Sequence, residues 1–261
     1  MGAMISTIVA PVRAAAPDAY ADAARSYLVV RDEQVLWERA PSLQLQPASL
    51  TKLLTALVVL DSDWNADRWI PVSATAAGIA PTRIGLRSGE EITAGAALAA
   101  MLVHSANDAC RVLVESVSPD VVSFTKRMNA RAEKLGMKRS KFIDPCGFDA
   151  ADQHSTVTDL LKLAYAARHA PLIATLTAVP HAQLTTRAGR TLKFGNTNQL
   201  LGRLEGAAGM KTGYTSQAGQ CLIAYARRGD HEVWLVMLGG TQRWWQAHGM
   251  IDDAFATAPA R

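Results

Sequence analysis

The sequence has little of what marks membrane-spanning or nucleic-acid-binding proteins. No uninterrupted apolar run reaches the roughly 18 residues that a transmembrane helix needs, so we expect no transmembrane anchor. Lys and Arg number 27 against 23 Asp and Glu, and they are scattered instead of gathered in a stripe with aromatic residues. We therefore expect no nucleic acid among its partners.

Cysteine is also scarce. The three cysteines, Cys110, Cys146 and Cys221, cannot all pair, and none belongs to a C-x-x-C motif or to a His/Cys cluster with metal-ligand spacing. On this basis we expect neither a disulfide framework nor a metal site.

Nothing in the 261 residues divides them into separate domains. There is no Pro/Gly/Ser-rich linker, low-complexity tract or repeat, and an apolar share of 49% with 19% charged residues is ordinary for a globular protein. We expect one domain over residues 23–258, with a helical lobe at about 65–165. Residues 1–22 contain Ala14-Ala-Ala16, which is similar to a signal-peptidase site, but no basic residue precedes the apolar stretch. We expect this segment to be an export signal or a cloning remnant outside the fold.

Residues that favour β-strands are concentrated near both ends of the chain. Residues 26–31 and 35–38 flank a polar turn and predict a hairpin. Residues 221–226 and 233–238 predict a second hairpin, into which residues 209–214 lead.

The middle of the chain has the spacing of helices. Helices are predicted at 50–60, 105–117, 119–135 and 156–169. Ser118 is expected to cap the third and Thr156 the fourth. Strands from both ends with helices between them indicate a mixed α/β (α+β) fold, in which one antiparallel sheet is built from the two chain ends and an all-helical lobe is inserted between them. The expected site is the groove between the lobes.

Ser49-Leu-Thr-Lys52 opens the most apolar of these helices, and Lys52 is the only charged residue from there to Leu60. At positions i and i+3 the hydroxyl and the amine share one side of the helix and can form a hydrogen bond. Burial lowers the pKa of an unpartnered ammonium, and a neutral amine can take a serine proton. The pattern predicts a nucleophile with its base, although it also fits a lysine that reaches solvent beside a capping serine.

The S-x-x-K pattern alone does not decide between these interpretations, because it occurs twice, and two other motifs are needed. Ser123-Phe-Thr-Lys126 is a second S-x-x-K, which we interpret as surface because it lies within an amphipathic helix. Ser105-Ala-Asn107 and Lys211-Thr-Gly213, by contrast, are the only S-x-N and K-T-G in the chain, and the latter is expected on an edge strand beside the groove. In this order, S-x-x-K, S-x-N and K-T-G resemble the motif set of the acyl-serine penicillin-recognising enzymes.

The similarity runs from about Ser26 to about Gly249 and points to the low-molecular-mass serine D,D-peptidases, which are penicillin-binding proteins. Within that group, Asn196-Thr-Asn198 and Ala218-Gly-Gln-Cys221 resemble the D,D-endopeptidases. The resemblance implies hydrolysis of D-alanyl peptide bonds in peptidoglycan, with cleavage of cross-links favoured and D-alanyl-D-alanine carboxypeptidase action as the alternative. It further implies peptidoglycan peptides as substrates, β-lactam antibiotics as covalent inhibitors, a periplasmic location and no cofactor.

The family's catalytic roles transfer to three positions. Ser49 would be the acylated nucleophile, Lys52 its general base, and Ser105 a relay that passes a proton to the leaving amine.

The implied substrate-binding residues are Asn107, Lys211, Thr212, Gly213 and Tyr214. Asn107 would bind the substrate backbone and contact Lys52, and Lys211 with Thr212 would hold an anionic group. The backbone N–H groups of Ser49 and Tyr214 would form the oxyanion hole.

Three alternatives compete with this prediction. A class A β-lactamase needs a loop glutamate, and residues 142–155 contain none. A P-loop nucleotide-binding protein needs glycine directly before the lysine of Gly206 to Thr212, where Met210 stands. A wall-binding or penicillin-sensing module that is acylated without turnover would carry the same three motifs, so this alternative stays open.

Overall fold

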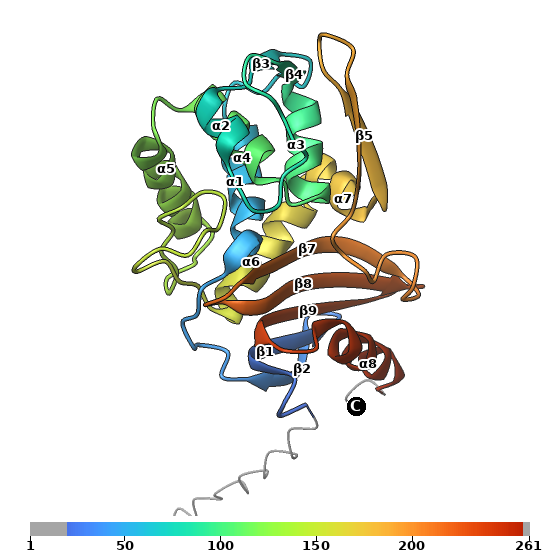
Figure 1. Cartoon of the computed structure of the whole chain (residues 1–261). Coiled ribbons are helices and arrows are strands. Elements are labelled where there is room, and N and C mark those ends of the chain that lie inside the picture. The colour runs from blue at the N-terminus through green and yellow to red at the C-terminus, as the bar shows by residue number, and fades with distance from the viewer. Residues whose placement is uncertain (1–19, 258–261) are drawn as a thin grey trace, which may run out of the picture.

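The computed structural model describes residues 20–257, and its centre is a five-stranded antiparallel sheet in the order β2-β1-β9-β8-β7 (Figure 1). The strands are β1 (Ala24–Arg31), β2 (Gln34–Arg39), β7 (Ala207–Thr215), β8 (Gly219–Arg228) and β9 (His231–Gly240). β1 pairs with β9, so the two ends of the chain build one sheet. Both predicted hairpins are confirmed, and the strand that carries K-T-G lies at the sheet edge as predicted.

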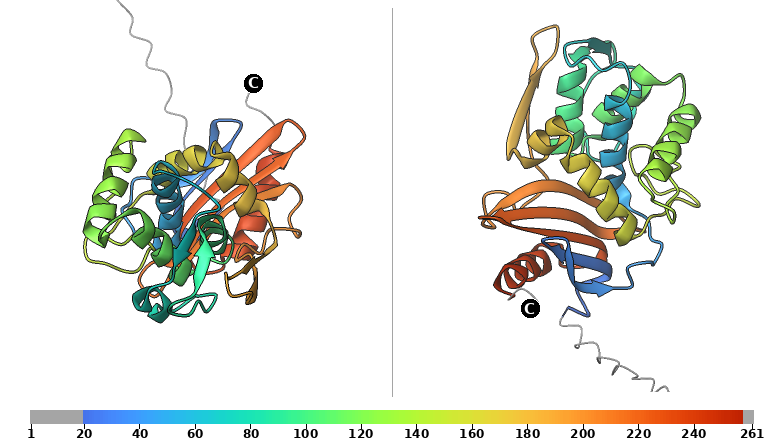
Figure 2. Two further views of the ribbon diagram at one scale, coloured as in Figure 1. Left: turned by 90° about the horizontal axis from the view of Figure 1, so that it is seen from above. Right: turned by 180° about the vertical axis from the view of Figure 1, so that it is seen from behind.

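The two faces of the sheet pack against different helices. Because side chains alternate along a strand, Val29 and Leu235 contribute to a cluster with the C-terminal helix α8 (Arg243–Ala256), whereas Leu28 and Val236 belong to a larger cluster on the opposite face. Figure 2 shows α8 alone on its side of the sheet, with the remaining helices on the other side.

The remaining helices lie beyond the second face of the sheet. They are α1 (Lys52–Leu60), α2 (Ala74–Gly78), α3 (Ala94–Val103), α4 (Asn107–Val117), α5 (Val121–Lys134), α6 (Val157–Arg168) and α7 (Pro171–Ala178). Two short ribbons accompany them: β3 (Trp69–Pro71) with β4 (Glu91–Thr93), and β5 (His181–Thr185) with β6 (Thr191–Gly195). The expectation of an all-helical inserted lobe is therefore wrong in one detail, because the β3–β4 ribbon lies among its helices.

Two helices begin where a polar side chain accepts a hydrogen bond from an N–H group of the first turn. Thr156 caps α6 as predicted, because its hydroxyl accepts from the Asp159 N–H at 3.1 Å. The predicted cap of α5 is wrong: Asp120, and not Ser118, accepts from the N–H of Ser123, at 2.7 Å. Ser118 lies two residues upstream, where its hydroxyl instead donates to the Asp120 carbonyl.

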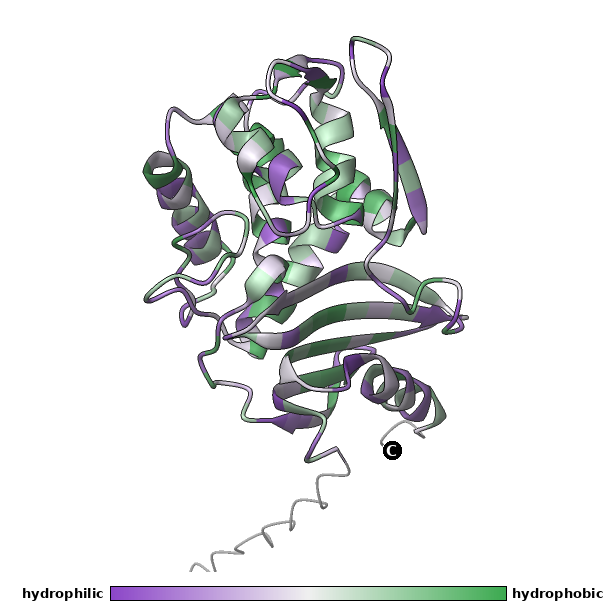
Figure 3. Cartoon of the chain, in the orientation of Figure 1, coloured by the Kyte–Doolittle hydropathy of each residue, from purple (hydrophilic) through white to green (hydrophobic). Residues whose placement is uncertain are grey.

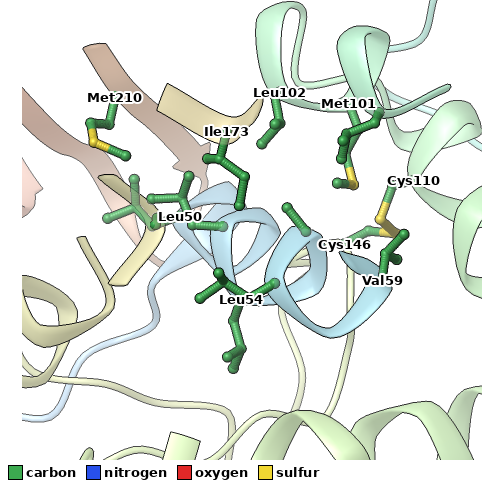
Figure 4. Packing of buried hydrophobic residues seen from close by; sticks show 14 of the residues in the cluster. Leu50, Leu54, Val59, Met101, Leu102, Cys110, Cys146, Ile173 and Met210 are labelled. Atoms are coloured by element: carbon green, nitrogen blue, oxygen red, sulfur yellow. A yellow bond between two sulfur atoms is a disulfide. The ribbon is translucent and has the colours of Figure 1, made fainter. Parts of the chain in front are cut away.

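Helix α1 lies at the centre of the larger hydrophobic cluster. The 3₁₀ turn η1 (Ala48–Thr51) precedes it, and every residue from Lys52 to Val59 is buried. Figure 4 shows Leu50 and Leu54 surrounded by side chains from neighbouring helices and strands. Figure 3 shows apolar residues on the inward sides of the surrounding helices, so the insertion and the sheet share one core.

Two of the three cysteines form a disulfide, which the sequence did not lead us to expect. Cys110 in α4 bonds to Cys146, a residue 36 positions later in the loop that follows α5 (Figure 4). The spacing carried no signal because the two residues meet only when α4 and this loop both pack beside α1. Cys221 is a buried free thiol.

Most of the segment assigned to an export signal or cloning remnant, residues 1–19, lies outside the described residues. Residues 20–22 form a turn that leads into β1, and the Tyr20 ring lies 5.5 Å from that of Trp37. Residues 20–22, which we placed before the domain, therefore belong to the described fold. Within residues 20–257, no helix has both the length and the apolar character needed to cross a bilayer.

Candidate active site

Ser49 lies in η1 at the edge of a cleft of about 430 Å³. Five segments meet there: η1, the turn at residues 81–82, the start of α4, the loop at 146–149 and the end of β7. The lining residues are Ser49, Pro81, Thr82, Asn107, Cys146, Gly147, Phe148, Asp149, Tyr214, Thr215 and Ser216. The Ser49 side chain is partly accessible while its neighbours Ala48 and Leu50 are buried, so a ligand in the cleft can reach its hydroxyl.

The Lys52 amine has three neighbours. Its Nζ lies 2.9 Å from Ser49 Oγ, 2.7 Å from Asn107 Oδ1 and within hydrogen-bond distance of the Cys146 carbonyl oxygen. An amide oxygen and a backbone carbonyl can only accept hydrogen bonds. In the neutral amine the two N–H groups are thus taken by Asn107 and Cys146, and the remaining lone pair faces the Ser49 hydroxyl. This arrangement makes the amine an acceptor for the serine proton.

Burial controls the charge of Lys52. The side chain is fully buried, and this burial lowers the pKa of Lys52 from 10.5 to about 7, although the Asp144 carboxylate opposes the shift. Removing an ammonium from water favours its neutral form because the apolar interior solvates charge poorly. Lys52 is buried as expected, and a pKa of about 7 leaves a substantial neutral fraction near neutral pH.

The S-x-N motif is held in place by its backbone. Ser105 is buried and has a φ of +61°, a left-handed conformation that helical residues do not adopt. The predicted helix start at Ser105 is therefore wrong, and α4 begins at Asn107. The Asn107 amide donates through Nδ2 to the Pro81 carbonyl at 2.6 Å. Since this contact requires the NH₂ group, it turns Oδ1 toward Lys52.

The K-T-G strand passes directly over the backbone of the nucleophile. A Cβ atom placed on Gly213 would lie 3.0 Å from the Ser49 nitrogen and 3.0 Å from the Ala48 Cβ. Glycine at this position therefore allows the close approach of the two backbones, and a larger residue would be in tight contact with η1. Tyr214, which is 66% exposed, follows it and lines the cleft.

Lys211 and Thr212 lie one and two residues before Gly213 and are both buried in the structure. Burial, with the charges of Lys52 and Arg243, holds the pKa of Lys211 well below its usual value. Its Nζ donates to the Thr212 carbonyl at 3.0 Å. Hydrogen bonds through the Lys52 amine thus join Ser49, Lys52 and Asn107, and within the described residues Ser105, Lys211 and Thr212 make no hydrogen bond to Ser49.

Three residues of the site were not predicted. The Cys146 carbonyl contacts Lys52, the Thr197 hydroxyl lies 2.7 Å from the Thr212 hydroxyl, and the Arg243 guanidinium donates to the Gly213 carbonyl at 2.6 Å. Thr197 lies in Asn196-Thr-Asn198, which the sequence marked only as a resemblance. A backbone carbonyl leaves no trace in sequence, so no pattern could have identified the role of Cys146.

Comparison with known proteins identifies the family. A family model described as D-alanyl-D-alanine carboxypeptidase, peptidase S11, matches residues 12–242. The chain belongs to the peptidase S11 family. This finding confirms the class that the three motifs predicted, a serine-type D-Ala-D-Ala peptidase.

S11 relatives with either named activity are similar to the chain. A D-alanyl-D-alanine endopeptidase of Pseudomonas aeruginosa is 34% identical over 208 residues, which are 78% of this chain and 67% of the relative. A D-alanyl-D-alanine carboxypeptidase of Bacillus subtilis is 30% identical over 243 residues, which are 90% of this chain. The chain spans 62% of the length of that second relative.

Solved S11-like structures confirm the predicted fold. The D-alanyl-D-alanine carboxypeptidase of Mycobacterium tuberculosis H37Rv superposes with a TM-score of 0.85 at 30% identity, over 91% of this chain and 92% of the other. The Streptomyces K15 DD-transpeptidase superposes with a TM-score of 0.85 at 26% identity, over 90% of this chain and 98% of the other.

The structure also explains two sequence motifs that lie outside the active site, the segment similar to a P-loop and the second S-x-x-K. Gly206 to Thr212 enters strand β7 and does not form a phosphate-binding loop before a helix. Ser123 donates to Asp120 at 3.0 Å on the outer side of α5, and Lys126 is exposed, so the second S-x-x-K is surface as predicted.

Proposed function

We propose that the chain is a serine D,D-peptidase that cleaves D-alanyl peptide bonds of peptidoglycan through an acyl-enzyme at Ser49. The observation that carries this proposal is the Lys52 amine, fully buried and 2.9 Å from Ser49 Oγ, with its other neighbours both hydrogen-bond acceptors. A base oriented in this way can remove the Ser49 proton while the hydroxyl oxygen attacks a carbonyl carbon.

The proposed acylation starts at Ser49. Lys52 takes the hydroxyl proton as Oγ attacks the carbonyl carbon, and the backbone N–H groups of Ser49 and Tyr214 stabilise the resulting oxyanion. Each donor of this kind typically contributes about 2.7 to 4 kcal/mol at the transition state. Ser105 passes the proton to the leaving amine, which departs as the acyl-Ser49 ester forms. Water then attacks the ester, the acyl group leaves as the peptide acid, and the Ser49 hydroxyl is regenerated.

The substrate would lie between the S-x-N turn and β7. Asn107 lines the cleft and can bind the substrate backbone on one side. Lys211 and Thr212 would bind the carboxylate of the substrate, and Gly213 would let the strand approach closely enough to place it. A buried lysine of lowered pKa gains a proton when a carboxylate arrives beside it, because the opposite charge favours the ammonium.

Within this activity we propose a preference for peptide cross-links over the terminal D-alanine of a free pentapeptide. The Asn196-Thr-Asn198 and Ala218-Gly-Gln-Cys221 segments support it, since they resemble the endopeptidases of the family. Carboxypeptidase action is the alternative.

We further propose a periplasmic location and covalent inhibition by β-lactam antibiotics. The Cys110–Cys146 disulfide supports the location, because disulfides form and persist in oxidising compartments. The acylation steps use only groups of the protein and the substrate.

The nucleophile is tested by mass spectrometry after incubation with a penicillin. The wild-type protein and the matched control Ser123→Ala should gain the mass of one penicilloyl group, and Ser49→Ala should gain none. Labelling of Ser49→Ala would refute the assignment. A wild-type protein that is labelled but releases no product from peptidoglycan peptides would instead be a penicillin-sensing module.

The substrate preference is tested with purified cross-linked muropeptide dimers and a pentapeptide at equal concentration. Monomer formation from the dimers should be faster than D-alanine release from the pentapeptide. If D-alanine release is much faster, the protein is a carboxypeptidase, while the assignments of Ser49 and Lys52 stand.

A further inference from the structure

The orientation of the Lys52 amine depends on two acceptors that come from different parts of the fold. Asn107 Oδ1 belongs to the first turn of α4, and the Cys146 carbonyl belongs to the loop after α5. If either acceptor moves, an N–H group of the neutral amine loses its partner. The amine can then rotate, and its lone pair no longer has one direction.

A covalent bond joins these two parts of the fold next to the amine. Cys110 lies three residues after Asn107, one turn along the same helix, and its disulfide partner is Cys146 itself (Figure 4). The Cα atoms of the two cysteines are 6.0 Å apart. The residue whose carbonyl accepts from Lys52 is therefore bonded to the helix that supplies the other acceptor.

Hydrogen bonds within the loop and to α1 fix the shape of the loop. They do not fix its distance from α4. The Asp144 carboxylate accepts from the Cys146 and Phe148 N–H groups, each at 2.9 Å. Thr55 of α1 donates to the Pro145 carbonyl at 2.5 Å. These contacts shape the loop and attach it to α1, and the disulfide sets its distance from α4.

We propose that the Cys110–Cys146 disulfide is a positioning device for the general base, which holds the Cys146 carbonyl at the Lys52 amine so that the lone pair points at Ser49. This inference rests on the proposed function, since it assigns a purpose to the orientation of that base. Neither cysteine side chain takes part in the proposed acylation steps. Their effect on the reaction passes through Lys52, so it falls on the rate of acylation and not on ligand binding.

The test uses three variants that lack the disulfide: Cys110→Ala, Cys146→Ala and the double variant. Stopped-flow measurements with a fluorescent penicillin give the acylation rate constant, the dissociation constant of the preceding complex and the fraction of protein that is acylated. We expect the rate constant to fall ~10- to 100-fold, the usual consequence of a misplaced catalytic group. The dissociation constant should change by less than about twofold, which indicates unaltered ground-state binding.

The three variants should show the same loss. Removing either cysteine already breaks the bond, so the second substitution has nothing further to remove, and the effects are not additive. The matched control is Val112→Ala, which removes a fully buried side chain from the same helix and leaves the disulfide intact. It should lower the thermal stability while the rate constant stays at the wild-type value.

The acylation rate constant describes only the folded molecules. Poor folding of a variant therefore lowers the acylated fraction and leaves the rate constant unchanged. Wild-type protein refolded with a phosphine reductant, which converts the disulfide to two thiols as the phosphine becomes its oxide, provides the same comparison without a substitution. A wild-type rate constant in the folded fraction of all these forms would overturn the proposal. Full recovery of the rate at high pH would overturn it as well, because the disulfide would then act on the charge of Lys52 and not on its orientation.

These outcomes remain separate from the proposed function. If Ser49→Ala is still labelled by penicillin, the proposed function fails whatever the disulfide does. If Ser49→Ala is unlabelled and the disulfide-free forms acylate at the wild-type rate, only the positioning role fails.

Discussion

Lys52 combines two properties that are seldom found in one lysine side chain. It is fully buried, and its nitrogen still has three polar neighbours within reach. Burial lowers the pKa to about 7, so a substantial fraction of the amine is uncharged near neutral pH, and the acceptors fix the direction of its lone pair. A base needs both, because a neutral amine that points elsewhere cannot take the Ser49 proton, and a correctly placed ammonium has no lone pair.

The first prediction concerns the pH dependence of acylation. The neutral amine is the reactive form and burial lowers the pKa of Lys52 to about 7, so the rate should rise with pH through about 7 and then level off. With an unshifted value of 10.5, the rise would continue far above neutral pH. Penicillin acylation rates measured across this range give the profile.

Lys52→Arg is the companion variant. Its guanidinium stays protonated throughout the range, so acylation should be nearly abolished at every pH. Substantial activity in this variant, or a profile without an inflection near neutral pH, would show that another group is the base.

The chemistry of these residues could be predicted from sequence because it depends on local spacing. Ser49 and Lys52 are three positions apart, and one turn of helix brings them together. The acceptors of Lys52 could not be predicted as a set, since Cys146 lies 94 positions from it and acts through its backbone. Asn107 was expected to contact Lys52 only through the family resemblance.

At the scale of elements, the site depends on the distance between β7 and the loops that face it. β7 lies at the sheet edge, and its Gly213 allows contact with the backbone of η1. Thr197 makes a second contact with β7, because its hydroxyl lies 2.7 Å from the Thr212 hydroxyl. The Thr197 N–H donates to the Val103 carbonyl at 3.1 Å. Thr197 therefore connects the end of α3, just before the S-x-N turn, to the K-T-G strand.

The second prediction concerns Thr197. If Thr212 donates its hydroxyl proton to a substrate carboxylate, it must accept from Thr197, so Thr197→Val leaves Thr212 without that donor. Thr212 is buried, and leaving its hydroxyl without a donor costs about 1 to 3 kcal/mol, which corresponds to roughly a 5- to 150-fold lower kcat/KM. Kinetics with a D-Ala-D-Ala peptide and with its C-terminal amide measure the effect.

The control for this prediction is Thr197→Ser, which keeps the hydroxyl and should retain most of the activity. The loss in Thr197→Val should be much larger for the carboxylate than for the amide. An equal loss with both substrates would mean that Thr197 only supports the local fold.

Helices and strands differed in how well the sequence predicted them. The strands at both chain ends and α6 were predicted because hydrophobic pattern, turn residues and caps agree there. The start of α4 was not, because Ser105 takes a left-handed backbone conformation that packing and not local preference imposes. The start of α5 differed because two neighbouring polar residues could each serve as its cap, and only the backbone geometry decides between them.

At the scale of the whole molecule, α1 joins the insertion to the sheet. The hydrophobic cluster around it includes Leu54 of α1, Leu113 of α4 and Val236 of β9, all fully buried. Trp234 of β9 extends this contact, with its ring 5.1 Å from that of Tyr165 in α6. Lys52 begins this helix and Ser49 lies in the η1 turn directly before it, so both depend on the core that the two parts of the fold share.

The last prediction follows from this shared core: the chain should unfold as one cooperative unit, as the absence of a linker in the sequence suggested. Far-UV circular dichroism, near-UV signals from the tryptophans and penicillin labelling should report the same transition midpoint, because the helical insertion and one face of the sheet share the core around α1. Leu54→Ala should lower the stability by about 2 to 5 kcal/mol, the usual cost of such a substitution in a core. It should shift all three signals together, whereas Val122→Ala, at a 64% exposed position of α5, should shift none. Separate midpoints in the wild type, or a Leu54→Ala shift confined to the labelling signal, would mean that the helical insertion and the sheet are independent folding units.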